Sequence, residues 1–194
     1  MKEVRALFAE ARAAGDGDDK NVAGVGIIYD TWTEIWPGYR ERINKGAVRL
    51  ADTVKSYFNH DPSKVLSTSD SSPALSLDDQ DDGLAYTSPI PPTSYGNDLR
   101  VNLERGNVRG SSFAFDIPKG GDKMWEDDNG IIHREIRQLN LYEVGPVTDP
   151  AFIQTSASLR STEKVIEEWK SNQPSPEPVS RELRRRRLRL MRIE

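Results

Sequence analysis

Short stretches of apolar and β-branched residues, separated by Gly, Pro, Asn and Asp, constrain the fold of this chain most strongly. The expected strands cover residues 4–11, 22–29, 54–58, 64–68, 74–77, 84–87, 112–117 and 131–144. The expected helices are short and cover residues 47–53, 95–105 and 162–170. Strands and helices do not alternate regularly, as they would in a doubly wound sheet. The pattern therefore predicts a mainly β fold with peripheral helices, arranged as a closed or nearly closed β-barrel.

Two local patterns refine this expectation. In the last long strand segment, Ile132 and Ile136 share one parity, whereas Leu139 and Leu141 share the other. Because side chains alternate between the two faces of a strand, the apolar face changes near residues 137–138, and we expect a bulge or break there. In the helix expected at 95–105, Ser94 is placed to cap the first turn and Gly106 to end the last one.

Charge is distributed unevenly along the 194 residues. The net charge is −4, but residues 181–194 hold seven arginines and two glutamates, so the preceding 180 residues carry about −9. Residues 171–180 contain three prolines alternating with polar residues, which is typical of a linker. We therefore predict a folded domain over 1–170, a Pro-rich linker over 171–180 and a basic C-terminal tail over 181–194. Because the body is acidic, these charges disfavour nucleic acid as a partner.

Composition also excludes several kinds of site. The chain has no cysteine, so disulfides, thiolate nucleophiles and cysteine-bound zinc are ruled out. With only two histidines, a histidine-rich metal site is not expected, and we predict no metal and no cofactor. No apolar run approaches the roughly 20 residues that a membrane-spanning helix needs. The first residues, MKEVRALFAEAR, lack the apolar centre of a signal peptide, so we do not expect secretion.

A base and a nucleophile are supplied by two segments about fifty residues apart. His60 lies in a polar turn directly after an apolar stretch, and histidine changes protonation near neutral pH, which suits a general base. Two serines follow Gly110, and strand parity separates them. Ser111 shares a face with the core residues Phe113 and Phe115, whereas Ser112 shares the other face with the small Ala114. Ser112 is therefore the better candidate for a nucleophile that His60 activates. A surface histidine and a serine that merely fills a strand position remain the alternative.

Four segments in order resemble the tailed-phage prohead proteases, a family of capsid-maturation serine proteases related in fold to herpesvirus assemblin. They are YRERINKGA at 39–47, FNHDPSKVL at 58–66, the run from TSYGNDL to LERGNVRGSSFAF at 93–115, and LYEVGPVTDPAF at 141–152. The resemblance covers roughly residues 3–155 and implies an assemblin-like β-barrel. The chain departs from the family pattern at Ser111, where methionine or another apolar residue is usual, and at Ala114, where glycine is common.

The resemblance also implies roles for individual residues. His60 would be the base and Ser112 the nucleophile, and an acidic third member near the end of the last long strand matches Glu143. Such a carboxylate fixes the imidazole tautomer and stabilises the imidazolium. The sequence offers other carboxylates for this role, namely Asp61, Glu135 and Asp149. Alternatively, His133 would take the role that the second histidine has in the herpesvirus enzymes. Backbone amides near Gly110 or Gly145 are candidates for the oxyanion hole.

The function that this resemblance implies is a serine endopeptidase acting inside the immature capsid, the prohead, in the cytoplasm of the bacterial host. Its expected substrates are scaffold, or the scaffolding segment of the major capsid protein, and finally the protease itself by autocleavage. Docking through the basic tail and self-association into a homo-oligomer remain open, and no membrane is expected to take part. The alternative is a catalytically silent capsid-assembly protein of the same fold.

Overall fold

The computed structural model describes residues 2–7, 11–15, 20–148 and 159–173. The chain divides into two units, residues 1–163 and 164–194, and each is described by itself. All the strands and helix α1 belong to the first unit, and α3 (Leu159–Ser171) runs from its end into the second. The predicted linker and tail lie mostly outside the described residues, so the predicted domain boundaries stay predictions.

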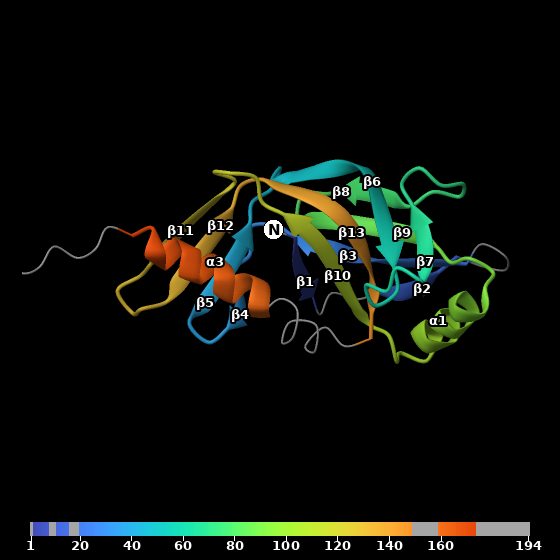
Figure 1. The fold of residues 1–194 in the computed structure, drawn as a ribbon. Coiled ribbons are helices and arrows are strands. Elements are labelled where there is room, and N and C mark those ends of the chain that lie inside the picture. The colour runs from blue at the N-terminus through green and yellow to red at the C-terminus, as the bar shows by residue number, and fades with distance from the viewer. Residues whose placement is uncertain (1, 8–10, 16–19, 149–158, 174–194) are drawn as a thin grey trace, which may run out of the picture. The chain divides into compact units, whose positions relative to one another are not determined.

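Three sheets make up the first unit (Figure 1). The first, sheet A, has the order β1 (Glu3–Leu7), β10 (Gly110–Asp116), β13 (Leu139–Val147), β6 (Val48–Tyr57) and β7 (Val65–Thr68). Sheet B has the order β2 (Arg12–Ala14), β3 (Asn21–Ile28), β9 (Gly83–Pro89) and β8 (Ser76–Asp79). Sheet C has the order β11 (Asp122–Glu126), β12 (Ile132–Ile136), β5 (Tyr39–Ile43) and β4 (Thr33–Trp36).

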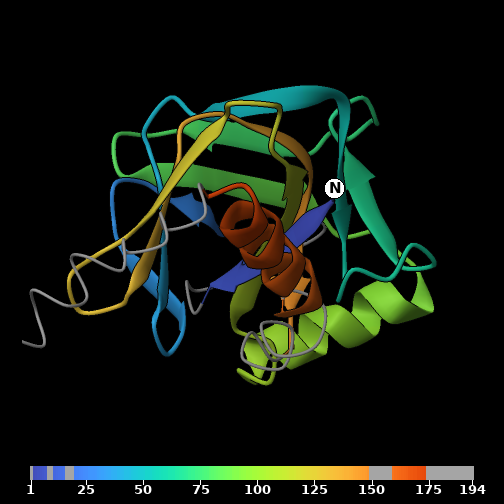
Figure 2. The same ribbon diagram turned by 60° about the vertical axis from the view of Figure 1, so that its left-hand side comes forward.

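Two neighbouring strands pass together from sheet C into sheet A (Figure 2). Strands β5 and β12 pair in parallel in sheet C, and their continuations β6 and β13 pair in parallel in sheet A. At the crossing the Asn44 amide donates to the Ile136 carbonyl at 2.9 Å, and the Leu139 amide donates to the Ala47 carbonyl at 2.9 Å. The break that parity predicts near residues 137–138 is this crossing, because β12 ends at Ile136 and β13 begins at Leu139.

The core lies where sheet A faces sheet B, with β10 and β13 against β3 and β9 (Figure 1). Its fully buried large side chains come from both sheets and from α1 (Ser94–Glu104). They include Val22, Ile27, Tyr86, Leu99, Phe113, Phe115 and Leu141. The rings of Phe113 and Phe115 stack 5.2 Å apart. Burial of these apolar side chains is the main favourable term that holds the two sheets together.

The prediction of a mainly β protein with peripheral helices is confirmed. The closed or nearly closed barrel is not, because the strand pairings of the described residues form three open sheets. The helix predicted at 47–53 is wrong: these residues form the first half of β6, where Val48 and Leu50 pair with β13. β-strand pairing between distant segments overrides local propensity here. The strands expected at 4–11 and 22–29 do not pair with each other, since β1 pairs with β10 and β3 pairs with β2 and β9.

A cluster of buried charges joins the edge of sheet A to sheet C. Its members come from four strands and are Glu3 and Arg5 on β1, Tyr39 and Glu41 on β5, Asp122 on β11, and Arg134 on β12. Arg5 donates to both carboxylate oxygens of Glu41 at 2.5 and 2.6 Å and to Glu3 at 2.8 Å. Arg134 donates to the two oxygens of Glu3 at 2.7 and 3.0 Å. Each buried charge therefore has partners of opposite sign, which such burial requires.

The ionised form of Glu41 contributes to stability. Burial alone would raise the pKa of Glu41, but the charges and hydrogen bonds of Arg5 and the charge of Arg134 outweigh burial and lower it from 4.5 to about 2. A carboxylate whose pKa is lower in the folded state stabilises the fold fully above its unfolded value, and this contribution disappears as the pH falls through the folded value. The window for Glu41 is therefore between about pH 4.5 and pH 2.

We therefore predict that Glu41→Gln lowers the free energy of unfolding by about 3 kcal/mol near neutral pH, because it leaves buried arginines short of a counter-charge. It should also flatten the loss of stability between pH 4.5 and pH 2. Urea unfolding at a series of pH values measures both effects. Glu34→Gln, on the exposed side of the adjacent β4, is the matched control and should change stability by less than about 0.5 kcal/mol. Equal stabilities of the two variants would contradict this role of Glu41.

Candidate active site

Ser112 lies in the middle of β10, between two paired strands. Its partners in register are Ala6 on β1 and Gly145 on β13. The alternation predicted from sequence holds around it: Ser111 is buried with its Oγ 3.2 Å from the Tyr86 hydroxyl in the core. Ser112 presents its hydroxyl on the opposite face of the sheet, where Glu143 is also placed by the register with Ala114.

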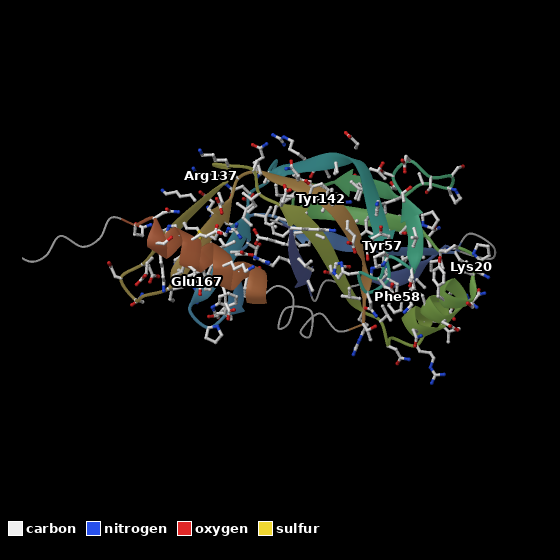
Figure 3. The ribbon with its side chains drawn as sticks, viewed as in Figure 1. Lys20, Tyr57, Phe58, Arg137, Tyr142 and Glu167 are labelled. Atoms are coloured by element: carbon white, nitrogen blue, oxygen red, sulfur yellow. The ribbon has the colours of Figure 1, made fainter. Side chains whose placement is uncertain are left out.

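His60 lies in the turn between β6 and β7. The turn follows Phe58 (Figure 3), and its two central residues, Asn59 and His60, adopt left-handed backbone conformations with φ of 55° and 56°. Backbone hydrogen bonds close the turn, from the Asp61 amide to the Phe58 carbonyl at 3.1 Å and from the Phe58 amide to the Lys64 carbonyl at 3.2 Å. This backbone path carries the imidazole of His60 back over sheet A toward β10 and β13.

The structure brings His60, Ser112 and Glu143 together in one hydrogen-bonded chain. Nδ1 of His60 lies 2.6 Å from Oε1 of Glu143, and Nε2 lies 2.5 Å from Oγ of Ser112. Ser112 and Glu143 are buried, whereas the His60 side chain is 19% exposed. With a proton on Nδ1 donated to the carboxylate, Nε2 is left as an acceptor for the serine hydroxyl. This is the arrangement of an acid, a base and a nucleophile.

The Ser112 hydroxyl has a second acceptor, the backbone carbonyl of Arg5 on β1, at 2.8 Å. A hydroxyl carries one proton and can donate to only one of the two acceptors at a time. With neutral His60 the proton can go to Nε2; with the imidazolium, Nε2–H donates to Oγ and the serine proton turns to Arg5. The carbonyl of Arg5 on the edge strand β1 therefore accepts the hydrogen bond of the hydroxyl whenever Nε2 of His60 is protonated.

The carboxylate of Glu143 also has a cation nearby. Lys2 Nζ lies 3.7 Å from Oε2 of Glu143, on the side away from His60. The lysine side chain is 57% exposed and the carboxylate 6% exposed, so solvent screens the lysine more than the glutamate. Both oxygens of this buried carboxylate thus face a positive or proton-donating group, as a buried charge requires.

Gly145 allows β6 and β13 to approach each other beside the nucleophile. A Cβ at this position would lie 2.3 Å from the carbonyl oxygen of Tyr57 and 3.2 Å from its amide nitrogen. Both are backbone atoms that cannot move aside without shifting the strand. Since Tyr57 is the last residue of β6 before the His60 turn (Figure 3), the absence of a side chain at Gly145 sets the height of that turn above Ser112.

The other candidates from sequence lie in different surroundings. The side chain of Asp61 accepts hydrogen bonds from Ser63, which lower its pKa, and Glu135 is bound to Arg42 and Arg137. His133 contacts Asp127 through Nε2 at 3.1 Å and stacks on Trp125. None of the three hydrogen-bonds to Ser112, and Asp149 lies outside the described residues.

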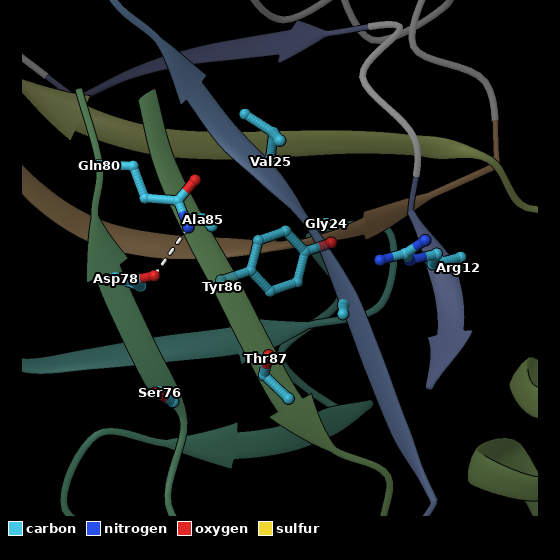
Figure 4. A pocket seen from close by; sticks show the side chains of 10 residues that line it. Arg12, Gly24, Val25, Ser76, Asp78, Gln80, Ala85, Tyr86 and Thr87 are labelled. Carbon is cyan, nitrogen blue, oxygen red and sulfur yellow. Dashed lines mark hydrogen bonds between the residues drawn. The ribbon is translucent and has the colours of Figure 1, made fainter. Parts of the chain in front are cut away.

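A surface hollow of about 570 Å³ lies away from this site (Figure 4). It lies over β3 and β9 of sheet B, between Arg12 on one side and Asp78 and Gln80 on the other. Within the described residues no group of three or more metal-ligating side chains is found, and the described helices include none long and apolar enough to cross a membrane.

Sequence reasoning missed the groups that hold the three residues in place. The Arg5 carbonyl, Lys2 and the side chain of Asn59 were not singled out, and Gly145 was considered only as a source of an amide. A glycine directly before a proline at the end of an apolar strand was the available signal for Gly145. For a backbone carbonyl on another strand no signal exists in the sequence.

Comparisons with known proteins identify the family of this chain. Residues 9–170 match the family model of caudovirus prohead serine proteases. Among solved structures, the capsid assembly protease of bacteriophage T4 is similar with a TM-score of 0.46 at 10% identity, covering 77% of this chain and 99% of that one. No curated protein sequence gives a significant match.

We predict that Gly145→Ala separates β6 from β13 and displaces His60. The added methyl group should lower the free energy of unfolding by about 1–3 kcal/mol, as overpacking does in other buried positions. Urea unfolding measures the stability, and ¹⁵N-histidine NMR reports the ring of His60, which is one of only two histidines in the chain. Unchanged stability together with an unchanged His60 ring would contradict the close approach described here.

Proposed function

Because the chain belongs to the caudovirus prohead serine protease family, we propose that it is an active serine endopeptidase of capsid maturation with Ser112, His60 and Glu143 as its catalytic residues. The observation that carries this proposal is the unbroken hydrogen-bonded chain from Glu143 through His60 to Ser112. A silent assembly protein of the same fold would not need these three side chains to be hydrogen-bonded to one another. Their geometry therefore favours the enzyme over the alternative.

The proposed reaction follows from the positions of the protons. His60 Nε2 takes the hydroxyl proton as Ser112 Oγ forms a bond to the carbonyl carbon of the scissile peptide, and Glu143 stabilises the imidazolium that results. The peptide C–N bond then breaks, and Nε2 returns the proton to the leaving amine. A water molecule, deprotonated by His60 in the same way, hydrolyses the acyl-enzyme and restores Ser112.

The proposed substrates are segments of the scaffold or of the scaffolding region of the major capsid protein, and finally the protease itself. The family assignment supports this substrate class, because prohead proteases act on precursor capsids. The corresponding place of action is the prohead in the host cytoplasm. Self-association of the enzyme is compatible with this role and is left to measurement of its oligomeric state.

Replacement of Ser112 or His60 should abolish processing, and replacement of Glu143 should slow it. Co-expressed with the major capsid protein, Ser112→Ala and His60→Ala should leave it uncut, as followed by intact mass. Glu143→Gln should slow cleavage by on the order of 10³- to 10⁴-fold, since the imidazole loses its orienting acceptor. Ser111→Ala is the matched control, a neighbouring serine on the opposite face, and should retain most activity. An inactive wild-type chain with normal folding would favour the silent assembly protein; an inactive Ser111→Ala with an active Ser112→Ala would reverse the assignment.

The basic tail, residues 181–194, is proposed as a docking arm for an acidic scaffold surface. Its seven arginines lie among Leu183, Leu188, Leu190, Met191 and Ile193, so an amphipathic helix would present both charge and an apolar stripe. Tethering of this kind raises the local concentration of the enzyme without a part in catalysis. The whole segment lies outside the described residues, so the sequence alone supports this arm.

Truncation before Arg181 should then reduce incorporation of the protease into proheads while leaving peptide cleavage in solution intact. Quantitative mass spectrometry of purified proheads measures incorporation, and a full-length chain with the seven arginines changed to glutamine separates charge from length. Autocleavage should remove the tail by a cut within roughly residues 155–180 in the active enzyme but not in Ser112→Ala. Full incorporation of the truncated protein would rule out docking through the tail.

A further inference from the structure

The turn that carries His60 is bound to the strand that carries Glu143 by one neighbouring residue, Asn59. The Asn59 amide nitrogen donates to the Pro146 carbonyl at 3.1 Å. Its side-chain oxygen accepts from the Thr148 amide at 2.8 Å, and its side-chain nitrogen donates to the Thr148 hydroxyl at 3.0 Å. Within the described part of the chain, these and the bond from His60 to Glu143 are the hydrogen bonds that join this turn to the end of β13.

Apart from the contact of His60 Nε2 with Ser112 on β10, the other polar contacts of the turn act within the turn itself. The side chain of Asp61 accepts from the amide and hydroxyl of Ser63 at 2.9 and 2.6 Å, and the Lys64 amide donates to the Asp61 carbonyl at 2.9 Å. These bonds make the turn a compact unit but do not fix its orientation over β13. Asn59, which is adjacent to the base, orients the turn through its bonds to Pro146 near the end of β13 and to Thr148 just after it.

The backbone conformation explains why an asparagine suits this position. Two consecutive non-glycine residues with positive φ are costly, on the order of 1–2 kcal/mol each, and asparagine tolerates this region better than most residues do. Glycine would adopt the same conformation with less strain but has no side chain to bind Thr148. Asparagine combines a tolerated positive φ with an amide that can accept from one group and donate to another.

We propose that Asn59 is a positioning residue that, together with Thr148, holds the His60 imidazole between Glu143 and Ser112. This inference rests on the proposed protease function, although the geometry that it describes can be tested without a peptide substrate. The residue touches neither the nucleophile nor the scissile bond. Its effect is to restrict the turn to the orientation in which Nδ1 meets the carboxylate and Nε2 meets the hydroxyl.

The test compares full-length Asn59→Gly, Asn59→Ala and Thr148→Val. Asn59→Gly keeps the positive φ and removes only the side-chain bonds, whereas Asn59→Ala also strains the backbone. Thr148→Val removes the hydroxyl but keeps the amide that donates to Asn59. The matched control is Asn107→Gly. Asn107 is an exposed asparagine in the turn after α1, and its side chain donates to the side chain of Asn102 within α1.

Two measurements are made on each variant. The first is the rate at which diisopropyl fluorophosphate labels Ser112, followed by intact mass, because labelling requires the serine to be activated by His60. The second is ¹⁵N-histidine NMR, which reports the tautomer of the His60 ring whether or not the protein is active. A displacement of the base by about 1 Å can reduce the rate by about 100-fold.

We expect Asn59→Gly to slow labelling by about 10- to 100-fold and to relax the His60 tautomer away from Nδ1–H, while thermal stability stays near that of the wild type. Thr148→Val should cause a smaller loss of several-fold, Asn59→Ala should also lower the melting temperature, and Asn107→Gly should change neither readout. Wild-type labelling and an unchanged tautomer in Asn59→Gly would overturn the proposal. If the wild type itself is not labelled, the protease function fails, and the NMR comparison alone then decides whether Asn59 positions the ring.

Discussion

The buried ion cluster around Arg5 is the interaction on which the arrangement of the other parts depends. Arg5 binds Glu41 through two hydrogen bonds, and Arg134 binds Glu3 through two more, so β1 of sheet A is joined to sheet C by charges rather than by a backbone ladder. Removing any one charge leaves its neighbours buried with fewer partners of opposite sign, which destabilises the cluster as a whole. The residue that anchors β1 in this way also offers its carbonyl to Ser112.

The three residues proposed as catalytic take their spacing from three adjacent strands of sheet A. Ser112 lies on β10 and Glu143 on the neighbouring β13, and His60 follows β6 on the far side of β13. The parallel pair β6 and β13 is held at its start by the crossing from sheet C and at its end by the close approach at Gly145. A rigid sheet thus fixes two of the groups, and only the turn with His60 needs separate support.

Sequence reasoning succeeded where local periodicity decides the structure. Alternation in β10 separated Ser112 from Ser111, and the change of parity near residues 137–138 marked the crossing between sheets. It failed where distant segments compete for pairing: residues 47–53 suit a short helix locally but are held as a strand by β13. The ion cluster could not be predicted for the same reason, because its four buried charges are separated by up to 131 residues along the chain. Three open sheets rather than one barrel follow from such long-range pairings.

The N-terminal strand β1 contributes to the site although it carries none of the three residues proposed as catalytic. The carbonyl of Arg5 on this strand accepts from the Ser112 hydroxyl. Lys2, which directly precedes the strand, approaches the carboxylate of Glu143. A buried carboxylate is stable only with charge or hydrogen-bond partners, and before His60 becomes protonated Lys2 is its cationic neighbour. In the proposed reaction, the imidazolium of His60 would become a second cationic neighbour of this carboxylate. Because β1 is fixed by the ion cluster, the electrostatic environment of the catalytic residues depends on salt bridges formed at the other face of the same strand.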